Sequence, residues 1–215
     1  MKITKYGHAC MVIEEQGKNL VIDPNIYAAD LPSISNVVAI VITHAHGDHY
    51  SPELVARILS DNPGAVIYGT SEVVAVAEKN AIKVTAVEAG QSVETTSFQI
   101  TFFGGRHAYI FKETPQNENV GMLVNGKFYY PGDSFDTPGD IHPEVLALPV
   151  SGPWLKIGEA MEFLAKVAPT KLCIPTHDGM LSQSGLQINE RMLPAICEQS
   201  GATLQVLKSG ESVDV

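Results

Sequence analysis

The segment from Thr43 to His49, with the sequence Thr-His-Ala-His-Gly-Asp-His, constrains this chain more than any other feature. It places three imidazoles and one carboxylate within six residues, directly after an apolar run at residues 37–42 that predicts a buried strand. Neutral imidazole is the commonest metal ligand, and a carboxylate binds the same ions. A polar surface turn is the alternative interpretation, but the whole chain has only seven histidines. The segment therefore predicts a metal-binding loop with enough ligands for two ions.

The composition fits one well-packed domain and argues against nucleic acids and membranes as partners. The 215 residues are 45% hydrophobic and no linker divides them, so we predict a single domain over residues 1–215. The net charge of −10 opposes binding to phosphate backbones, and no apolar run approaches a membrane span. The first residues lack the apolar core of a signal peptide, which favours a cytoplasmic location. The scattered Cys10, Cys173 and Cys197 predict small buried side chains, because they are too few for a disulfide framework.

The apolar patterns predict short strands and helices in an α/β (α+β) fold. We expect strands at residues 3–6, 9–14, 19–23, 37–43, 65–69, 83–87, 92–96, 98–103, 119–124, 127–130, 145–150 and 172–175. We expect helices at residues 51–60, 71–80, 157–168 and 186–199, and a closing hairpin at residues 203–215. Two mixed sheets packed face to face, with the helices outside, would bury the apolar faces of all these elements.

Further candidate ligands also lie at the ends of predicted strands. Asp23 ends the third strand, and His107, Asp133 and His177 each follow a later one. A rigid sheet can hold side chains at its strand ends around a common point. Singly, His107 could be an ordinary loop residue and Asp133 a turn residue, but the order of the whole set indicates ligands.

This set resembles that of the metallo-beta-lactamase superfamily. The motifs occur in order along the chain, as Asp23, His44-x-His46-x-Asp48-His49, His107, Asp133 and His177. Within the superfamily, the chain is similar to small single-domain hydrolases related to ascorbate-phosphate lactonase. The shorter segments that carry this second resemblance are Gly7-His8, Asp23-Pro24, Asn119-Val120-Gly121, Tyr130-Pro131-Gly132-Asp133-Ser134 and Leu148-Pro149-Val150-Ser151-Gly152-Pro153.

The resemblance implies a four-layer αββα sandwich with two divalent metal ions between the sheet edges. One ion would be held by His44, His46 and His107, and the second by Asp48, His49 and His177. Asp133 would bridge both ions, and Asp23 would orient the histidine loop from outside. The catalytic roles would fall to Asp48, His49 and Asp133, with Asp48 as a further proton acceptor. Zinc is the first expectation for the metal, and manganese or iron would also suit these ligands.

The expected function is that of a metal-dependent hydrolase. Two ions about 3.5–4 Å apart can activate a shared water as hydroxide and stabilise the charge that develops during attack. Two divalent cations, two carboxylates and one hydroxide leave a local charge of about +1. We therefore expect a small anionic substrate, cleaved at an ester, lactone or phosphodiester bond. The sequence leaves the substrate's identity open, and it is compatible with a homo-oligomer.

Three other functions compete with this one. A non-catalytic metal-binding or sensor domain is disfavoured because the ligand set is complete. A nuclease is disfavoured because the chain is acidic and lacks room for an added binding domain. A diiron redox enzyme of the same superfamily is disfavoured because such enzymes commonly have Glu at the position of His46.

Several residues near the candidate ligands have open roles. His8 could line the mouth of the site or be a buried structural histidine, and Trp154 could face the substrate or cover the core. Arg106 could bind an anion, although an outward salt bridge is the more common fate of such a residue. Ser134 could donate a hydrogen bond near the site or end a turn, and His142 is expected on the surface.

Overall fold

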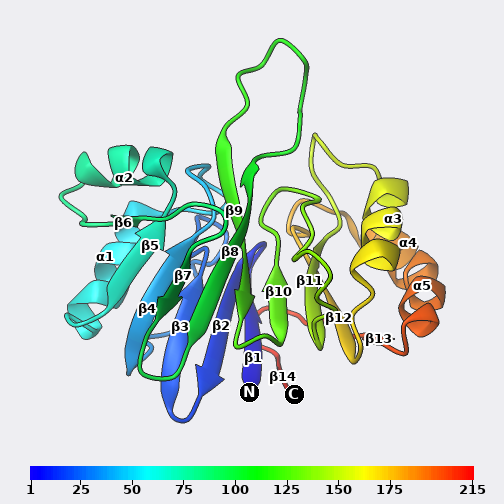
Figure 1. Cartoon of the computed structure of the whole chain (residues 1–215), viewed down its shortest axis with the longest axis horizontal. Helices are drawn as coiled ribbons and strands as arrows, with labels where there is room; N and C mark the ends of the chain where they lie inside the picture. Colours follow the sequence, from blue (N-terminus) through cyan, green and yellow to red (C-terminus); the bar gives the residue numbers. More distant parts are fainter.

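Two seven-stranded sheets packed face to face form the centre of the computed structural model, which describes residues 1–215 (Figure 1). The first sheet has the order β14 (Ser212–Asp214), β1 (Lys2–Tyr6), β2 (Cys10–Glu15), β3 (Lys18–Ile22), β4 (Val37–Ile42), β5 (Val66–Gly69) and β6 (Thr85–Ala86). The second has the order β13 (Thr203–Leu204), β12 (Leu172–Thr176), β11 (Val145–Pro149), β10 (Phe128–Tyr130), β9 (Glu118–Val124), β8 (Gln99–Arg106) and β7 (Ser92–Glu94).

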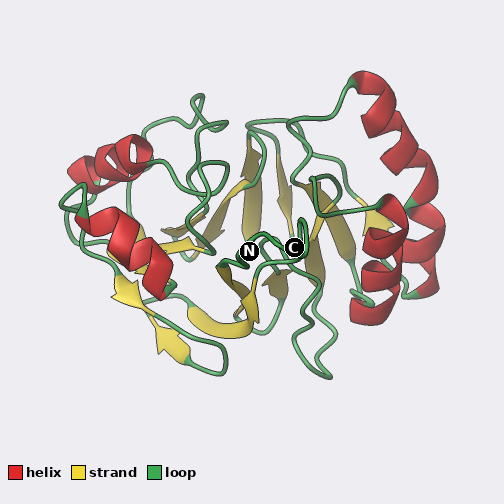
Figure 2. Cartoon of the chain, turned by 90° about the horizontal axis from the view of Figure 1, so that it is seen from above, coloured by secondary structure: helices red, strands yellow, loops and turns green.

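Helices cover the outer face of each sheet, as the view from above shows (Figure 2). The first sheet carries α1 (Pro52–Asp61) and α2 (Ser71–Glu78), and the second carries α3 (Ile157–Val167), α4 (Gln183–Met192) and α5 (Pro194–Gln199). The start of α1 follows from its sequence, since the Ser51 hydroxyl accepts a hydrogen bond from the Leu54 N–H and Pro52 occupies the first turn. The four layers confirm the predicted αββα sandwich. None of the helices combines the length and apolar character that crossing a bilayer requires.

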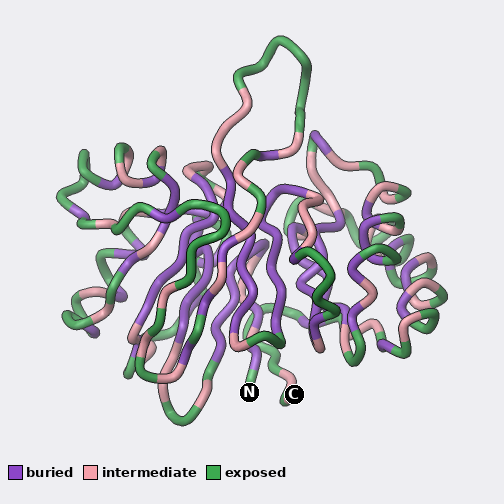
Figure 3. Tube along the Cα trace, in the orientation of Figure 1, coloured by how far each residue is buried: buried purple, intermediate pink, exposed green.

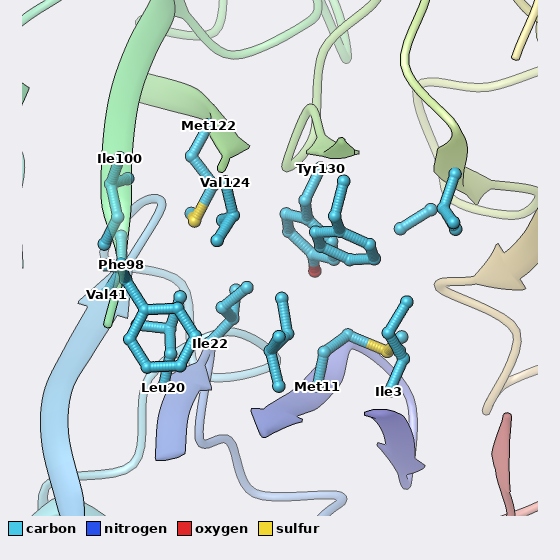
Figure 4. Packing of buried hydrophobic residues seen from close by; sticks show 14 of the residues in the cluster. Ile3, Met11, Leu20, Ile22, Val41, Phe98, Ile100, Met122, Val124 and Tyr130 are labelled. Atoms are coloured by element: carbon cyan, nitrogen blue, oxygen red, sulfur yellow. The ribbon is translucent and has the colours of Figure 1, made fainter. Parts of the chain in front are cut away.

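The main core lies between the two sheets and contains 20 buried hydrophobic residues (Figures 3 and 4). Strand β4 shows how the sequence builds this packing. Val41 belongs to the core between the sheets, whereas Ile40 and Ile42 pack beneath the helices. Because both faces of β4 are buried, its sequence is apolar throughout, and it forms a rigid support for the loop that follows.

Strand direction brings the predicted ligands to one edge of the sandwich. In the first sheet β3 and β4 are parallel, and in the second β10, β11 and β12 are parallel. Strand β8 has the same direction as β10, because both are antiparallel to β9. The strand ends of the two sheets also meet, since Asp133 after β10 lies 3.0 Å from His49 after β4.

Two predicted elements at the carboxyl end of the chain are wrong. The expected helix at residues 186–199 is two helices, because a proline inside a helix removes a backbone donor and Pro194 instead begins α5. The expected hairpin at residues 203–215 is divided between the sheets: β13 pairs in parallel with β12, and β14 pairs with β1.

In the first half of the chain, the predicted strand at residues 83–87 is present only as the two residues of β6.

Candidate metal centre

All seven predicted ligands converge at the sheet edge, and they come from four loops. His44, His46, Asp48 and His49 follow β4, His107 follows β8, Asp133 follows β10 and His177 follows β12. His46 and Asp48 are half-buried, whereas the other five are buried. The cluster is therefore open to solvent on the side of the histidine loop and closed toward the core.

The Asp133 carboxylate lies at the centre of this cluster. Its Oδ1 atom is 3.0 Å from His49 Nε2, and its Oδ2 atom is 3.0 Å from His177 Nε2 and 3.3 Å from His107 Nε2. The Nε2 atom of His44 lies 4.0 Å from the same Oδ2. One carboxylate thus faces imidazoles from both sides, which is the arrangement that a bridging ligand requires.

The backbone around Asp133 is fixed by a glycine and by Asn119. Gly132 has φ +63°, and a Cβ there would lie 2.4 Å from Asn119 Oδ1 and 2.9 Å from Thr43 Cβ, so only glycine fits. The Asn119 amide donates to the Pro131 carbonyl, and its oxygen accepts from the Asp133 N–H. Sequence reasoning gave Asn119 no role, although the Asn119-Val120-Gly121 segment was part of the resemblance.

The ligand atoms form overlapping groups. His44, His46 and His107 present donor atoms within 4.8 Å of one another, as the resemblance implies for the first metal. The three residues expected at the second metal do not form a separate group. His49 and His177 gather with Asp133, while Asp48 and His177 gather with His8.

Asp23 orients two imidazoles from behind the histidine loop. Its Oδ2 atom lies 2.6 Å from Nδ1 of His49 and 2.8 Å from the Thr43 hydroxyl, which donates to it. Because the Thr43 proton is used in this way, its oxygen is free to accept from Nδ1 of His44 at 3.0 Å. Both histidines therefore carry a proton on Nδ1 and direct Nε2 into the cluster. Asp23 thus has the outer, orienting position that the resemblance implies.

His107 has the same tautomer for a different reason. Its Nδ1 atom lies 2.6 Å from the Ala108 carbonyl, which can only accept, so Nδ1 carries the proton and Nε2 is free. Neither ring nitrogen of His177 has a hydrogen-bond partner, and the same is true of His49 Nε2 and Asp133 Oδ1. Buried polar atoms are normally paired. A cluster of unpaired donor atoms that are good metal ligands is the arrangement that fits divalent ions.

The titration behaviour of the cluster also suits metal binding. Burial lowers the pKa of His44 well below its usual value, so this imidazole is neutral. Burial alone would lower the pKa of His49, but the Asp133 and Asp23 carboxylates outweigh it and raise the pKa. Burial alone would likewise raise the pKa of Asp133, but the charge of the adjacent His49 imidazole, with His107 and His177 also close by, lowers it. In the metal-free protein, a protonated His49 therefore supplies the positive charge beside Asp133 that a metal ion would otherwise supply.

His8 is buried in the turn between β1 and β2, and its tautomer differs from that of the other histidines. Its Nδ1 atom accepts a hydrogen bond from the Gly179 N–H at 2.8 Å, so the neutral ring must carry its proton on Nε2. Burial lowers the pKa of His8 to about 3. Its Nε2–H has no hydrogen-bond partner and lies 3.8 Å from Asp48 Oδ2, and a nitrogen that carries the proton has no lone pair for a metal.

Trp154 reaches the cluster as well. Its side chain is buried against the Phe135 ring, and its indole N–H donates to Asp133 Oδ2 at 2.9 Å, so it contacts the site directly. The remaining open residues lie outside the cluster. Arg106 is exposed and donates to the Gln116 carbonyl, Ser134 bonds within its own turn, and His142 bonds to the Val167 carbonyl.

Comparison with known proteins agrees with the fold and the cluster. A family model described as a beta-lactamase superfamily domain matches residues 2–177. Protein Rv0786c of Mycobacterium tuberculosis is 32% identical over 187 residues, which cover 85% of this chain and 86% of that protein. A UPF0173 metal-dependent hydrolase of Methanosphaera stadtmanae is 27% identical over 200 residues, which cover 82% and 83% of the two chains.

A solved structure shows the same fold at lower identity. Igni18, a metallo hydrolase from the archaeon Ignicoccus hospitalis, matches with a TM-score of 0.72 and 20% identity, over 99% of this chain and 97% of that one. The family model spans most of the sequence, and its match includes every candidate ligand from His44 to His177. The chain therefore belongs to the beta-lactamase superfamily, and it is a metal-dependent hydrolase of that superfamily.

Proposed function

We propose that this hydrolase holds two divalent ions in the cluster around Asp133. The observation that carries the proposal is the set of unpaired, buried donor atoms on His49, His177 and Asp133. His44, His46 and His107 would hold one ion, and Asp48, His49 and His177 the other, with Asp133 between them. Zinc suits these ligands best, and manganese and iron are the alternatives.

The bound ions would supply a hydroxide at neutral pH, because two cations lower the pKa of a shared water. The chain's own residues would orient the metal ligands and accept the proton. Asp133 is held in position by hydrogen bonds with Asn119 and Trp154, and it would lie between the ligands of the two ions. Asp48 is the half-exposed carboxylate of the cluster, with 26% of its side chain accessible, so it is placed to accept a proton from the nucleophile or pass one to the solvent.

The substrate we propose is a small molecule with a carboxylate or phosphate beside an ester, lactone or phosphodiester bond. Two divalent ions, two carboxylates and one hydroxide leave the site with a charge of about +1, which attracts an anion although the whole chain carries −10. The similarity to lactonases suggested by the sequence points to the same class of substrate.

Metal analysis and a substrate panel test this proposal together. Protein purified without chelator should contain close to two ions per chain and should hydrolyse anionic esters, lactones or phosphodiesters, with inhibition by inorganic phosphate. Asp133→Ala should lose metal from both sites and lose activity, because it removes the bridging carboxylate. His142→Ala is the matched control, since His142 bonds to the Val167 carbonyl outside the cluster.

Two outcomes would contradict the proposal. If Asp133→Ala retained both ions and full activity, Asp133 would not be a bridge. If the loaded protein bound two ions but cleaved none of the panel, the sensor alternative would be favoured. Faster turnover of neutral esters than of every anionic analogue, without phosphate inhibition, would overturn the substrate class.

A further inference from the structure

An aromatic cavity of about 430 Å³ lies beside the metal cluster, between α3 and the loop after β8. Three rings form a continuous wall. The ring centres of Phe135 and Trp154 are 5.3 Å apart, and those of Phe135 and Phe163 are also 5.3 Å apart. Ala108 and Tyr109 complete the wall on the side of the loop. An apolar cavity of about 150 Å³ is known to hold benzene, so this one has room for a phenyl ring with several methylenes.

Trp154 is shared by the cavity and the metal cluster. Its ring lines the cavity, while its N–H donates to Asp133 Oδ2. The ring centre lies 5.8 Å from that of His107 and 6.0 Å from that of His177. Trp154 therefore contacts three candidate ligands, Asp133, His107 and His177. A small substrate with one group bound against the indole could place its remaining atoms at the metal cluster.

The loops around the cluster expose large apolar side chains. Tyr109, Ile110 and Phe111 lie in the loop between β8 and β9, which projects beyond the sheets at the top of Figure 1. Ile26 and Tyr27 follow β3, and Met180 follows β12. Six of the ten exposed large hydrophobic residues thus lie in loops that follow the strands next to the cluster, although the chain as a whole is acidic. Apolar side chains concentrated in this way mark a binding surface.

The charges of the cavity indicate which part of a substrate it takes. Glu159, Glu162 and Lys166 line its side formed by α3, which gives a formal charge of −1. Glu159 is already bound to the Lys156 N–H as part of the cap of α3. A second anionic group is therefore disfavoured here, whereas the aromatic wall favours an uncharged apolar group.

We propose that this cavity binds an uncharged aryl or alkyl group of the substrate while the anionic end and the scissile bond lie at the metals. The substrate is then amphiphilic, for example a carboxylate or phosphate ester with a phenyl-sized apolar group. The inference rests on the proposed two-metal site and substrate class for the position of the bond, but the cavity can be tested separately.

The test uses Trp154, which is the only tryptophan in the chain and so reports binding in the cavity directly. Metal-loaded protein is titrated with ω-phenylalkanoates of increasing length, and with acetate, while indole fluorescence is recorded. Affinity should rise by about fourfold for each methylene until the ring is seated, which corresponds to roughly 0.8 kcal/mol per buried methylene. The kcat/KM of matching esters should follow the same series.

Three variants complete the test. Tyr109→Ala and Phe135→Ala should flatten the dependence on chain length in both measurements, because each removes part of the wall. Tyr109 is 65% exposed, so its loss should not unfold the protein. Ile188→Ala is the control, since this exposed residue of α4 lies outside the cavity.

The outcomes separate the two proposals. If phenylalkanoates bind with the expected series but no ester is cleaved, the cavity proposal is supported and the proposed substrate class is wrong. If esters are cleaved but neither affinity nor kcat/KM depends on the apolar group, the cavity proposal is overturned. It is also overturned if Tyr109→Ala changes only the sedimentation of the protein, since a second copy of the chain would then be covering this surface.

Discussion

At the scale of single residues, the hydrogen-bond partner of each imidazole determines which ring nitrogen carries the proton. That nitrogen decides whether the side chain can bind a metal through Nε2. The Nδ1–H of His107 donates a hydrogen bond to the Ala108 carbonyl, which leaves Nε2 free for a metal. His8 accepts from the Gly179 N–H instead, so its Nε2 carries the proton. The two residues lie in the same cluster and are both buried, yet they have opposite chemical roles. We therefore interpret His8 as a positioning residue that restrains Asp48.

This interpretation makes a prediction for two variants of His8. His8→Phe removes the donor and should weaken metal binding at the site containing Asp48 by roughly 10–100-fold, as loss of an outer partner does. His8→Gln retains an N–H near the position of Nε2 and should recover most of that loss. Metal content under limiting metal measures both. Failure of Gln to recover binding, with complete loss of one ion in both variants, would instead identify His8 as a ligand.

At the scale of elements, a buried ion pair joins the two sheets beneath the site. Lys5 on β1 donates to Asp178, which follows β12 and His177, at 2.5 Å. The Lys5 side chain is 2% exposed and that of Asp178 is 11% exposed. The backbone N–H of His177 also donates to the His8 carbonyl at 2.8 Å. These contacts hold the loop after β12 against the turn after β1.

We predict that the two partners of this pair respond unequally to substitution. Asp178→Asn should destabilise the protein by about 3–5 kcal/mol, because it leaves the Lys5 ammonium buried without its charge partner. Lys5→Met should cost less, because Asp178 is the more exposed partner and burial already raises its pKa, which favours its neutral form. Urea unfolding in the presence of chelator measures both free energies without a contribution from metal. Lys171→Met, in an exposed pair with Glu144, should change stability by less than about 1 kcal/mol. Equal losses in the two buried variants would contradict this asymmetry.

At the scale of the whole molecule, metal binding should be coupled to pH. The Asp133 and Asp23 carboxylates raise the pKa of His49 despite its burial, so the metal-free protein holds a proton on this residue. A metal ion bound to His49, as we propose, would have to displace that proton, so protonation should compete with the metal as pH falls.

The apparent metal affinity should fall with decreasing pH, by up to about tenfold per pH unit for each proton released. Competition with a chelator of known affinity, from about pH 8 to about pH 6, measures this slope, with the titration of the chelator itself taken into account. His142→Ala should leave the slope unchanged. An affinity that is constant over this range would show that His49 is already unprotonated in the metal-free protein.

The sequence by itself determined which candidate ligands the chain offers and which strands carry them. Three imidazoles and a carboxylate after a buried apolar strand predicted a metal loop, since such ligands in such density have few other uses. The two-sheet sandwich followed from elements whose apolar faces all had to be buried. These properties are local in the chain, so periodicity and residue type were sufficient to predict them.

Only the tertiary structure decided what depends on contacts between distant segments. It divided the expected closing hairpin between two sheets, because the partners of β13 and β14 lie far away in the sequence. It placed Trp154 on Asp133 and assigned the protons of His8 and His107, which depend on a backbone amide and a carbonyl that no side-chain pattern reveals. Hydrogen-bond partners and cavity walls are set by packing across the fold, and for this reason the sequence could name the candidate ligands but not their surroundings.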